Sequence, residues 1–263
     1  MPKFCANLSL LFADVPLAER FGRAAKAGFR AVEIQFPYEL PAAQTAGLLQ
    51  AHELELVLHN LPAGDWAAGD RGIAVQAARQ GEFREGVARG IEYARAVGCR
   101  RLNCLAGLPA AGEEHARCFE TLVENLAHAA EALDKAGLRL LLEPVNTKDV
   151  PGFFLSSTLE ALRVMVAVAH PNLQLQFDLY HMQRMEGDLI HTINALAGPG
   201  EGPRIGHMQI ADNPGRHEPG TGEINFGNVF SAIDAAGYEG WVGCEYLPGG
   251  HTEDGLGWLQ AYL

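Results

Sequence analysis

The sequence of 263 residues has no apolar run long enough to cross a membrane, since a spanning helix needs roughly 20 consecutive apolar residues. It also lacks the basic head and cleavable tail of a signal peptide, because Asn7 and Ser9 interrupt its first apolar stretch. We therefore expect a protein that lies in the cytoplasm and has no membrane partner.

Cysteine pairs at CxxC spacing are absent as well. The five cysteines are odd in number and lie mostly in apolar segments, at positions 5, 99, 104, 118 and 244. A buried free cysteine behaves as a small hydrophobic residue. This usage favours reduced core side chains over disulfides or a catalytic role.

A stripe of Lys and Arg is also missing, and the net charge of −12 is spread along the chain. Such a surface repels the phosphate backbone of a nucleic acid, so we expect no nucleic-acid partner. The composition, with 48% hydrophobic and 20% charged residues, is typical of a soluble globular protein.

Short apolar runs rich in strand-forming residues alternate with longer segments of helical period. This alternation is typical of repeated βα units around a parallel sheet. Eight such runs can be counted, at residues 4–9, 31–36, 55–60, 101–105, 139–144, 173–178, 205–210 and 241–246. Helical segments are expected at residues 17–27, 42–52, 82–97, 113–136, 158–169, 188–197, 228–236 and 253–262.

Eight strands, each followed by a helix, within roughly 250 residues predict a (β/α)8 TIM barrel, with residues 1–263 as a single domain. An open, doubly wound sheet is the alternative fold. No GxGxxG follows the first apolar run, and eight evenly spaced units favour closure of the sheet.

In such a barrel the active site lies at the carboxyl ends of the strands. The residues at these ends are nearly all polar: Asn7, Glu33, His59, Asn103, Glu143, Asp178, Gln209 and Glu245. The last four follow one another at intervals of about one βα unit. We therefore expect their side chains to converge on one side of the barrel mouth.

Glu143 is notable because it follows the apolar run from Leu140 to Leu142, where a charge needs a partner. Three converging carboxylates raise each other's pKa unless a cation lies between them. A ligand set of Glu143, Asp178, Gln209 and Glu245 is all oxygen, which favours a divalent metal such as Mg²⁺ or Mn²⁺ over zinc. Salt-bridged structural carboxylates are the alternative.

Further polar residues lie near the same ends. His59 ends the third strand, His181 follows Asp178 by three residues, and Arg216 lies in the loop after the seventh strand. We expect them to bind a substrate, since arginine can hold an anionic group through two parallel hydrogen bonds. For each residue a structural or surface role is the alternative. The irregular segment 61–80, which contains Trp66, is expected to cover the mouth.

Five segments carry a family resemblance: residues 59–66 (HNLPAGDW), 143–146 (EPVN), 180–187 (YHMQRMEG), 206–216 (GHMQIADNPGR) and 243–246 (GCEY). They resemble the hydroxypyruvate isomerase family, within the xylose-isomerase-like TIM barrels. The resemblance implies interconversion of hydroxypyruvate and tartronate semialdehyde, with Glu143 and Glu245 as the paired proton-transfer residues. Gln209 stands where the wider superfamily often has His.

The mechanism expected from this resemblance is an isomerisation through an enediolate, with a small 2-oxo acid as substrate and a divalent metal polarising its oxygens. A sister activity on 2-oxo-tetronates uses nearly the same scaffold and stays open. Two other classes are weighed: a metal-dependent abasic-site endonuclease, and a non-catalytic protein that binds sugar acids. The sequence leaves open whether the protein is a homo-oligomer.

Overall fold

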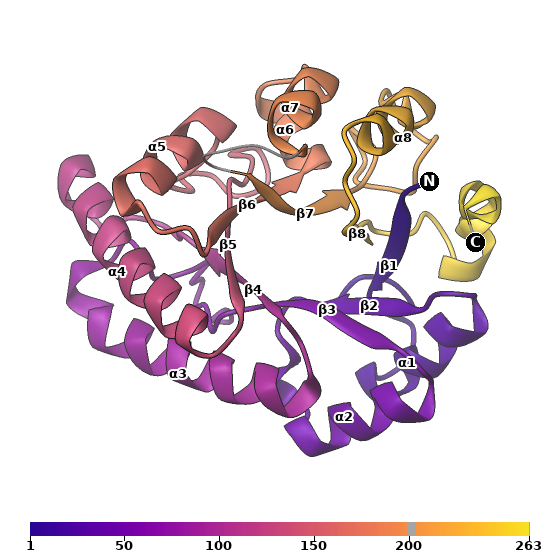
Figure 1. Ribbon diagram of the computed structural model, residues 1–263, viewed down its shortest axis with the longest axis horizontal. Coiled ribbons are helices and arrows are strands. Elements are labelled where there is room, and N and C mark those ends of the chain that lie inside the picture. Colours follow the sequence, from indigo (N-terminus) through magenta and orange to yellow (C-terminus); the bar gives the residue numbers. More distant parts are fainter. Residues whose placement is uncertain (199–203, 263) are drawn as a thin grey trace.

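The structure, a computed structural model, describes residues 1–198 and 204–262. Eight parallel strands pair in chain order and close into a barrel (Figure 1). Their bounds are β1 Lys3–Asn7, β2 Ala31–Ile34, β3 Glu55–Asn60, β4 Arg101–Leu105, β5 Arg139–Glu143, β6 Leu173–Asp178, β7 Ile205–Ile210 and β8 Trp241–Cys244. The predicted TIM barrel is confirmed, and the open doubly wound sheet is wrong.

Helices surround the barrel on its outside (Figure 1). They are α1 Leu17–Lys26, α2 Ala42–Ala51, α3 Gln80–Val97, α4 His115–Lys135, α5 Thr158–Val168, α6 Leu179–Met185, α7 Leu189–Leu196 and α8 Phe226–Ala235. Short 3₁₀ segments are η1 Pro37–Glu39, η2 Ala77–Arg79 and η3 Thr252–Ala261. No described helix is both long and apolar enough to span a bilayer.

Two helical elements differ from the sequence prediction. The segment expected as a helix at residues 253–262 is the 3₁₀ element η3, in which Gly255 and Gly257 disfavour a regular α-helix. The short helix α6 was not predicted. It follows β6 without a loop, and the Asp178 side chain caps it by accepting a hydrogen bond from the Tyr180 backbone N–H at 2.8 Å.

Strand β5 illustrates how the barrel wall positions a polar site. Leu140 and Leu142 pack outward into the large core under the helices, whereas Leu141 packs inside the barrel with Cys5 and Val57. Because side chains alternate along a strand, Glu143 points inward above Leu141. The apolar barrel floor therefore carries a layer of polar side chains at the carboxyl ends of the strands.

The barrel closes where β1 pairs with β8, with Lys3 opposite Trp241. Aromatic rings cover this seam on the outside. The Phe4 ring lies 5.0 Å from Phe230, 5.1 Å from Trp258 and 5.4 Å from Tyr262, measured between ring centroids. Edge-to-face contacts of this kind add to the stability gained from burial alone.

Candidate active site

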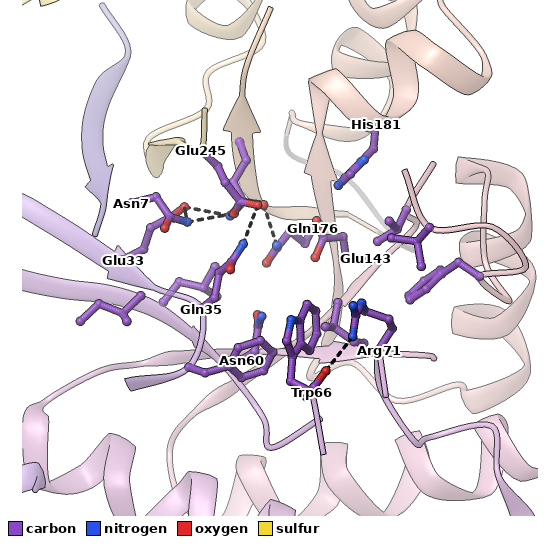
Figure 2. A pocket seen from close by; sticks show the side chains of 18 of the residues that line it. Asn7, Glu33, Gln35, Asn60, Trp66, Arg71, Glu143, Gln176, His181 and Glu245 are labelled. Carbon is purple, nitrogen blue, oxygen red and sulfur yellow. Dashed lines mark hydrogen bonds between the residues drawn. The ribbon is translucent and has the colours of Figure 1, made fainter. Parts of the chain in front are cut away.

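A cavity of about 120 Å³ opens at the carboxyl ends of the strands (Figure 2). It is smaller than the roughly 300–1,000 Å³ pockets of drug-sized ligands, so it suits a small molecule. Its polar walls come from several strands and from the loop after β3, and include Asn60, Arg71, Glu143, His181, Arg216 and Glu245.

Glu143 and Asp178 lie together with His181. One side-chain ligand atom of each lies within 4.8 Å of the other two. Asn103 fixes Glu143 by donating a hydrogen bond from Nδ2 to Oε2 at 2.7 Å. Asp178 is fully buried, and its Oδ2 atom has no hydrogen-bond partner among the described residues. The predicted convergence of these strand ends is present.

The pKa values of two carboxyls are raised. Burial raises the pKa of Glu143 well above its ordinary value, and the neighbouring Glu245 and Asp178 raise it further. Burial also raises the pKa of Glu245, to about 8, although the Arg216 guanidinium opposes the shift. A carboxyl group such as that of Glu245, with a pKa near the working pH, is suited to accept and return protons.

Arg216 is paired with the site carboxylates, whereas it was expected to bind a substrate. Its Nη2 atom is 2.5 Å from Glu245 Oε1 and 3.8 Å from Asp178 Oδ2. Its guanidinium also lies over the Tyr180 ring, 5.2 Å from the centroid. Arg216 therefore lines the cavity and offsets the charge of the acidic residues there, and its predicted role in substrate binding stays a prediction.

Gln209 turns its amide nitrogen toward the acidic residues. Nε2 donates to Oε1 of Glu33 at 2.8 Å and to Oε2 of Glu245, while Oε1 accepts from Gln176 Nε2 at 2.7 Å. A side chain between two carboxylates must donate, because its carbonyl oxygen would be repelled there. The oxygen expected as a metal ligand therefore faces Gln176.

His181 lines the cavity as expected. Its Nε2 atom lies 3.5 Å from Asp178 Oδ2, and its Nδ1 atom lies 2.6 Å from Asn146 Nδ2. Burial lowers the pKa of His181 to about 4, so the ring is neutral at physiological pH. Figure 2 shows the ring directed from α6 into the cavity.

His59 does not line the cavity, which corrects its expected role in substrate binding. Its ring packs between Tyr38 and Tyr93, 5.7 Å from each ring centroid. The next residue, Asn60, faces the cavity instead. Because adjacent strand residues point to opposite faces, one of these two polar side chains had to face the helix layer.

The loop after β3 supplies a residue that the sequence analysis missed. Arg71 lines the cavity, and its guanidinium stacks on Trp66 at 4.2 Å from the ring centroid. Its Nη1 donates to the backbone carbonyls of Trp66 and Asp70. Figure 2 shows Trp66 and Arg71 on the side of the cavity opposite Glu245 and His181. The lack of periodicity in residues 61–80 gave no signal for Arg71, although the segment was expected over the mouth.

Glu143 and Asp178 lie close enough together to share a divalent cation, whereas Glu245 does not belong to this close group of ligand atoms. Glu143, Asp178 and Glu245 are buried oxygen donors, and Asp178 Oδ2 is left without a hydrogen bond in the described part of the chain. Mg²⁺ and Mn²⁺ prefer such oxygen ligands. Gln209 fits less well, because its amide nitrogen faces Glu245.

Residues 21–262 match the family described as Xylose isomerase-like TIM barrel, and the chain belongs to this family. Along its whole length it is 50% identical to the hydroxypyruvate isomerase of Escherichia coli (strain K12), over 262 residues and all of that protein. It is 45% identical to a 2-oxo-tetronate isomerase of Cupriavidus necator, over 100% of this chain and 99% of the relative.

A crystal structure titled AP endonuclease, family 2, from Brucella melitensis is also similar. It superposes with a TM-score of 0.95 at 46% identity and covers 100% of this chain and 99% of the other. The two isomerases match this chain over essentially their full lengths. These comparisons establish that the chain is an enzyme of the isomerase class.

Proposed function

We propose that the protein interconverts hydroxypyruvate and tartronate semialdehyde by proton transfer between Glu143 and Glu245. The observation that carries this proposal is the pair of buried carboxyl groups, Glu143 and Glu245, that line one small cavity. The name of the 50% identical relative from Escherichia coli supports the choice of substrate.

The reaction moves two hydrogens within one molecule and needs no external oxidant. One glutamate removes a proton from C3 of hydroxypyruvate, the carbon that carries the hydroxyl group, and an enediolate forms. The other glutamate delivers a proton to C2, while the proton of the C3 hydroxyl passes to the oxygen on C2. Two proton carriers facing one small cavity suit both steps.

We propose that Glu143, Asp178 and Glu245 hold a divalent cation, Mg²⁺ or Mn²⁺. Gln209 would join this set only after its amide rotates. When bound, such a cation supplies electrostatic stabilisation for negative charge on the substrate oxygens. His181 would donate a hydrogen bond to one of the same oxygens.

Arg71 is our proposed partner for the substrate carboxylate. No carboxylate in the described part of the chain lies within ion-pair distance of it, whereas Arg216 is paired with Glu245. Stacking on Trp66 holds the guanidinium in place, and this preorganisation favours two parallel hydrogen bonds to a carboxylate. A substrate held by Arg71 at one end would present its other end to Glu245 and His181.

Isomerisation of 2-oxo-tetronates is the second candidate. It is favoured by the 45% identical relative that carries this name. The substrate has one more carbon, so initial rates on hydroxypyruvate, tartronate semialdehyde and 2-oxo-tetronates, with Mg²⁺ and Mn²⁺ in turn, would separate the two activities.

The site argues against two other classes. An abasic-site endonuclease of this fold needs several His ligands and a basic surface. Within residues 1–198 and 204–262, each group of three potential metal ligands contains a single histidine, and the sequence carries a net charge of −12. A binding protein without catalysis would not need two buried carboxyl groups facing one small cavity. The five free, buried cysteines suit a reducing compartment, and we propose the cytoplasm.

The test is turnover of hydroxypyruvate in D₂O by Glu143→Gln and Glu245→Gln. Each variant should lose at least about 10²-fold in rate and in deuterium incorporation, the usual contribution of a general acid or base. The surface variant Glu120→Gln is the matched control and should behave as wild type. Near-wild-type rate and exchange in either site variant would reject the two-carboxylate mechanism.

A further inference from the structure

Asn146 lies three residues after Glu143 and is fully buried. Its Oδ1 atom accepts hydrogen bonds from the backbone N–H groups of Lys148 at 3.0 Å and Asp149 at 2.9 Å. Its Nδ2 atom donates to Asp149 Oδ2 at 3.0 Å. The opposite amide orientation would place oxygen against a carboxylate and NH₂ against two N–H donors, so these contacts allow only one orientation.

The same Nδ2 atom lies 2.6 Å from Nδ1 of His181. The backbone N–H of Asn146 also points to Nδ1, at 3.4 Å. Both neighbours of Nδ1 are donors, so Nδ1 must be the acceptor and cannot carry a hydrogen. A neutral imidazole has a single N–H, which is then on Nε2.

We infer that Asn146 is a positioning residue that fixes the tautomer of His181, so that Nε2 presents a hydrogen-bond donor to the reacting oxygen of the substrate. This inference rests on the proposed function for the identity of that oxygen, but the tautomer itself does not depend on it. The same tautomer also excludes His181 as a metal ligand. Although His181 lies within 4.8 Å of Glu143 and Asp178 oxygens, a protonated Nε2 has no lone pair for a metal.

Asp149 completes the arrangement. It accepts from the Tyr180 hydroxyl at 2.8 Å and from Arg184 Nη1 at 2.5 Å. These contacts hold the carboxylate where it orients the Asn146 amide. A chain of hydrogen bonds therefore connects Arg184 at the rim to the donor nitrogen inside the cavity.

The test reverses the polarity of this contact with little change in shape. In the double variant Asn146→Asp, Asp149→Asn, residue 146 still accepts from both backbone N–H groups and still bonds to residue 149. However, it now offers an acceptor to His181 Nδ1. The single variant Asp149→Asn is the matched control, since it also loses the charge beside Arg184 but keeps the amide at position 146.

The readout is the ¹⁵N spectrum of the histidine side chains at neutral pH in the metal-free protein. The chain has ten histidines, and the His181 signals are assigned by their loss in His181→Gln. Wild type and Asp149→Asn should show a protonated Nε2 and an unprotonated Nδ1. The double variant should gain a hydrogen on Nδ1. An unprotonated Nε2 in wild type, or an unprotonated Nδ1 in the double variant, would overturn the inference.

Kinetics then test the role of the donor. Relative to Asp149→Asn, kcat for hydroxypyruvate should fall about 10²-fold in the double variant, as for loss of one donor to a developing oxyanion, with a smaller change in KM. An unchanged kcat with the tautomer reversed would overturn this role. If wild type turned over no 2-oxo acid, the proposed function would fail, while the spectrum would still decide the tautomer.

Discussion

Glu33 and Glu245 share two hydrogen-bond donors. Asn7 Nδ2 donates to Oε1 of Glu33 and to Oε2 of Glu245, both at 2.9 Å, and Gln209 Nε2 donates to the same two oxygens. The two amides therefore bridge the site to a carboxylate in the barrel interior. Glu33 lies opposite Gly243, where any side chain would collide with its carboxylate.

This bridge predicts that Asn7→Asp is strongly destabilising. A third carboxylate would replace a donor between two acceptors, and an unpaired buried charge costs about 3 kcal/mol or more. The loss of unfolding free energy should be largest at pH 8. It should shrink as the pH falls, because the introduced carboxyl group can donate a hydrogen bond once it is protonated. Urea unfolding measures it, with Asn228→Asp on the exposed start of α8 as the control. Equal stability of the two variants at pH 8 would contradict the bridge.

Removal of the Arg216 charge should make the protein depend on metal for stability. We expect Arg216→Gln to lower the unfolding free energy in EDTA by about 2 kcal/mol. This is less than the roughly 3–5 kcal/mol of a fully buried pair, because the side chain is 20% exposed. Adding Mn²⁺ should then raise Tm more in the variant than in wild type. The surface variant Arg117→Gln is the control. An equal rise in Tm with Mn²⁺ in Arg216→Gln and wild type would contradict a cation site at these carboxylates.

Truncation of Arg71 should weaken substrate binding. A charged hydrogen bond contributes about 1.5–3 kcal/mol, which corresponds to a roughly 10- to 100-fold rise in KM of Arg71→Ala for 2-oxo acids. Arg71→Lys should recover part of the loss, because it restores the charge but not the paired geometry. Initial rates over a range of substrate concentrations measure the effect. A KM equal to that of Arg117→Ala would exclude Arg71 as the carboxylate partner.

Burial of His59 predicts a pH dependence of stability. Burial lowers the pKa of His59 from 6.5 to about 4, so between these values the unfolded chain binds a proton that the folded chain does not. Stability should therefore fall by about 1.4 kcal/mol per pH unit as the pH drops from 6.5 toward 4, and be unaffected by this group above 6.5.

His59→Phe keeps a ring between the two tyrosines and removes the titrating group. In this variant the slope of unfolding free energy against pH should be shallower by about 1.4 kcal/mol per pH unit. Urea titrations between pH 4.5 and 6.5 measure the slope, because this interval lies between the folded and unfolded pKa values of His59. The comparison variant is His191→Phe, which changes an exposed histidine on α7. Parallel slopes for wild type and His59→Phe would contradict the burial argument.

The barrel could be predicted because each strand is a short apolar run bounded by a helical segment, a pattern that depends on local sequence alone. The position of Glu143, Asp178 and Glu245 at one end of the barrel could be predicted for a related reason, since parallel strands bring their carboxyl ends to one face. These residues needed only a count of strands and no knowledge of side-chain contacts.

The errors arose where neighbours decide the geometry. Whether His59 or Asn60 faces the cavity depends on the phase of β3, and the pairing of β2 with β3 is irregular between Val32 and Glu33. The orientation of Gln209 depends on Gln176 and Glu33, which come from other strands. Arg71 lies in a loop, where no periodicity indicates direction.

The pairing of β1 with β8 has a consequence for synthesis. Lys3 and Trp241 come from opposite ends of the barrel sequence, so the first strand has both edges paired only after the last strand has left the ribosome. Until then, the nascent chain exposes an unpaired strand edge and lacks Trp258 and Tyr262, which later pack against the Phe4 ring. We expect a chain stalled before β8 to need chaperone protection.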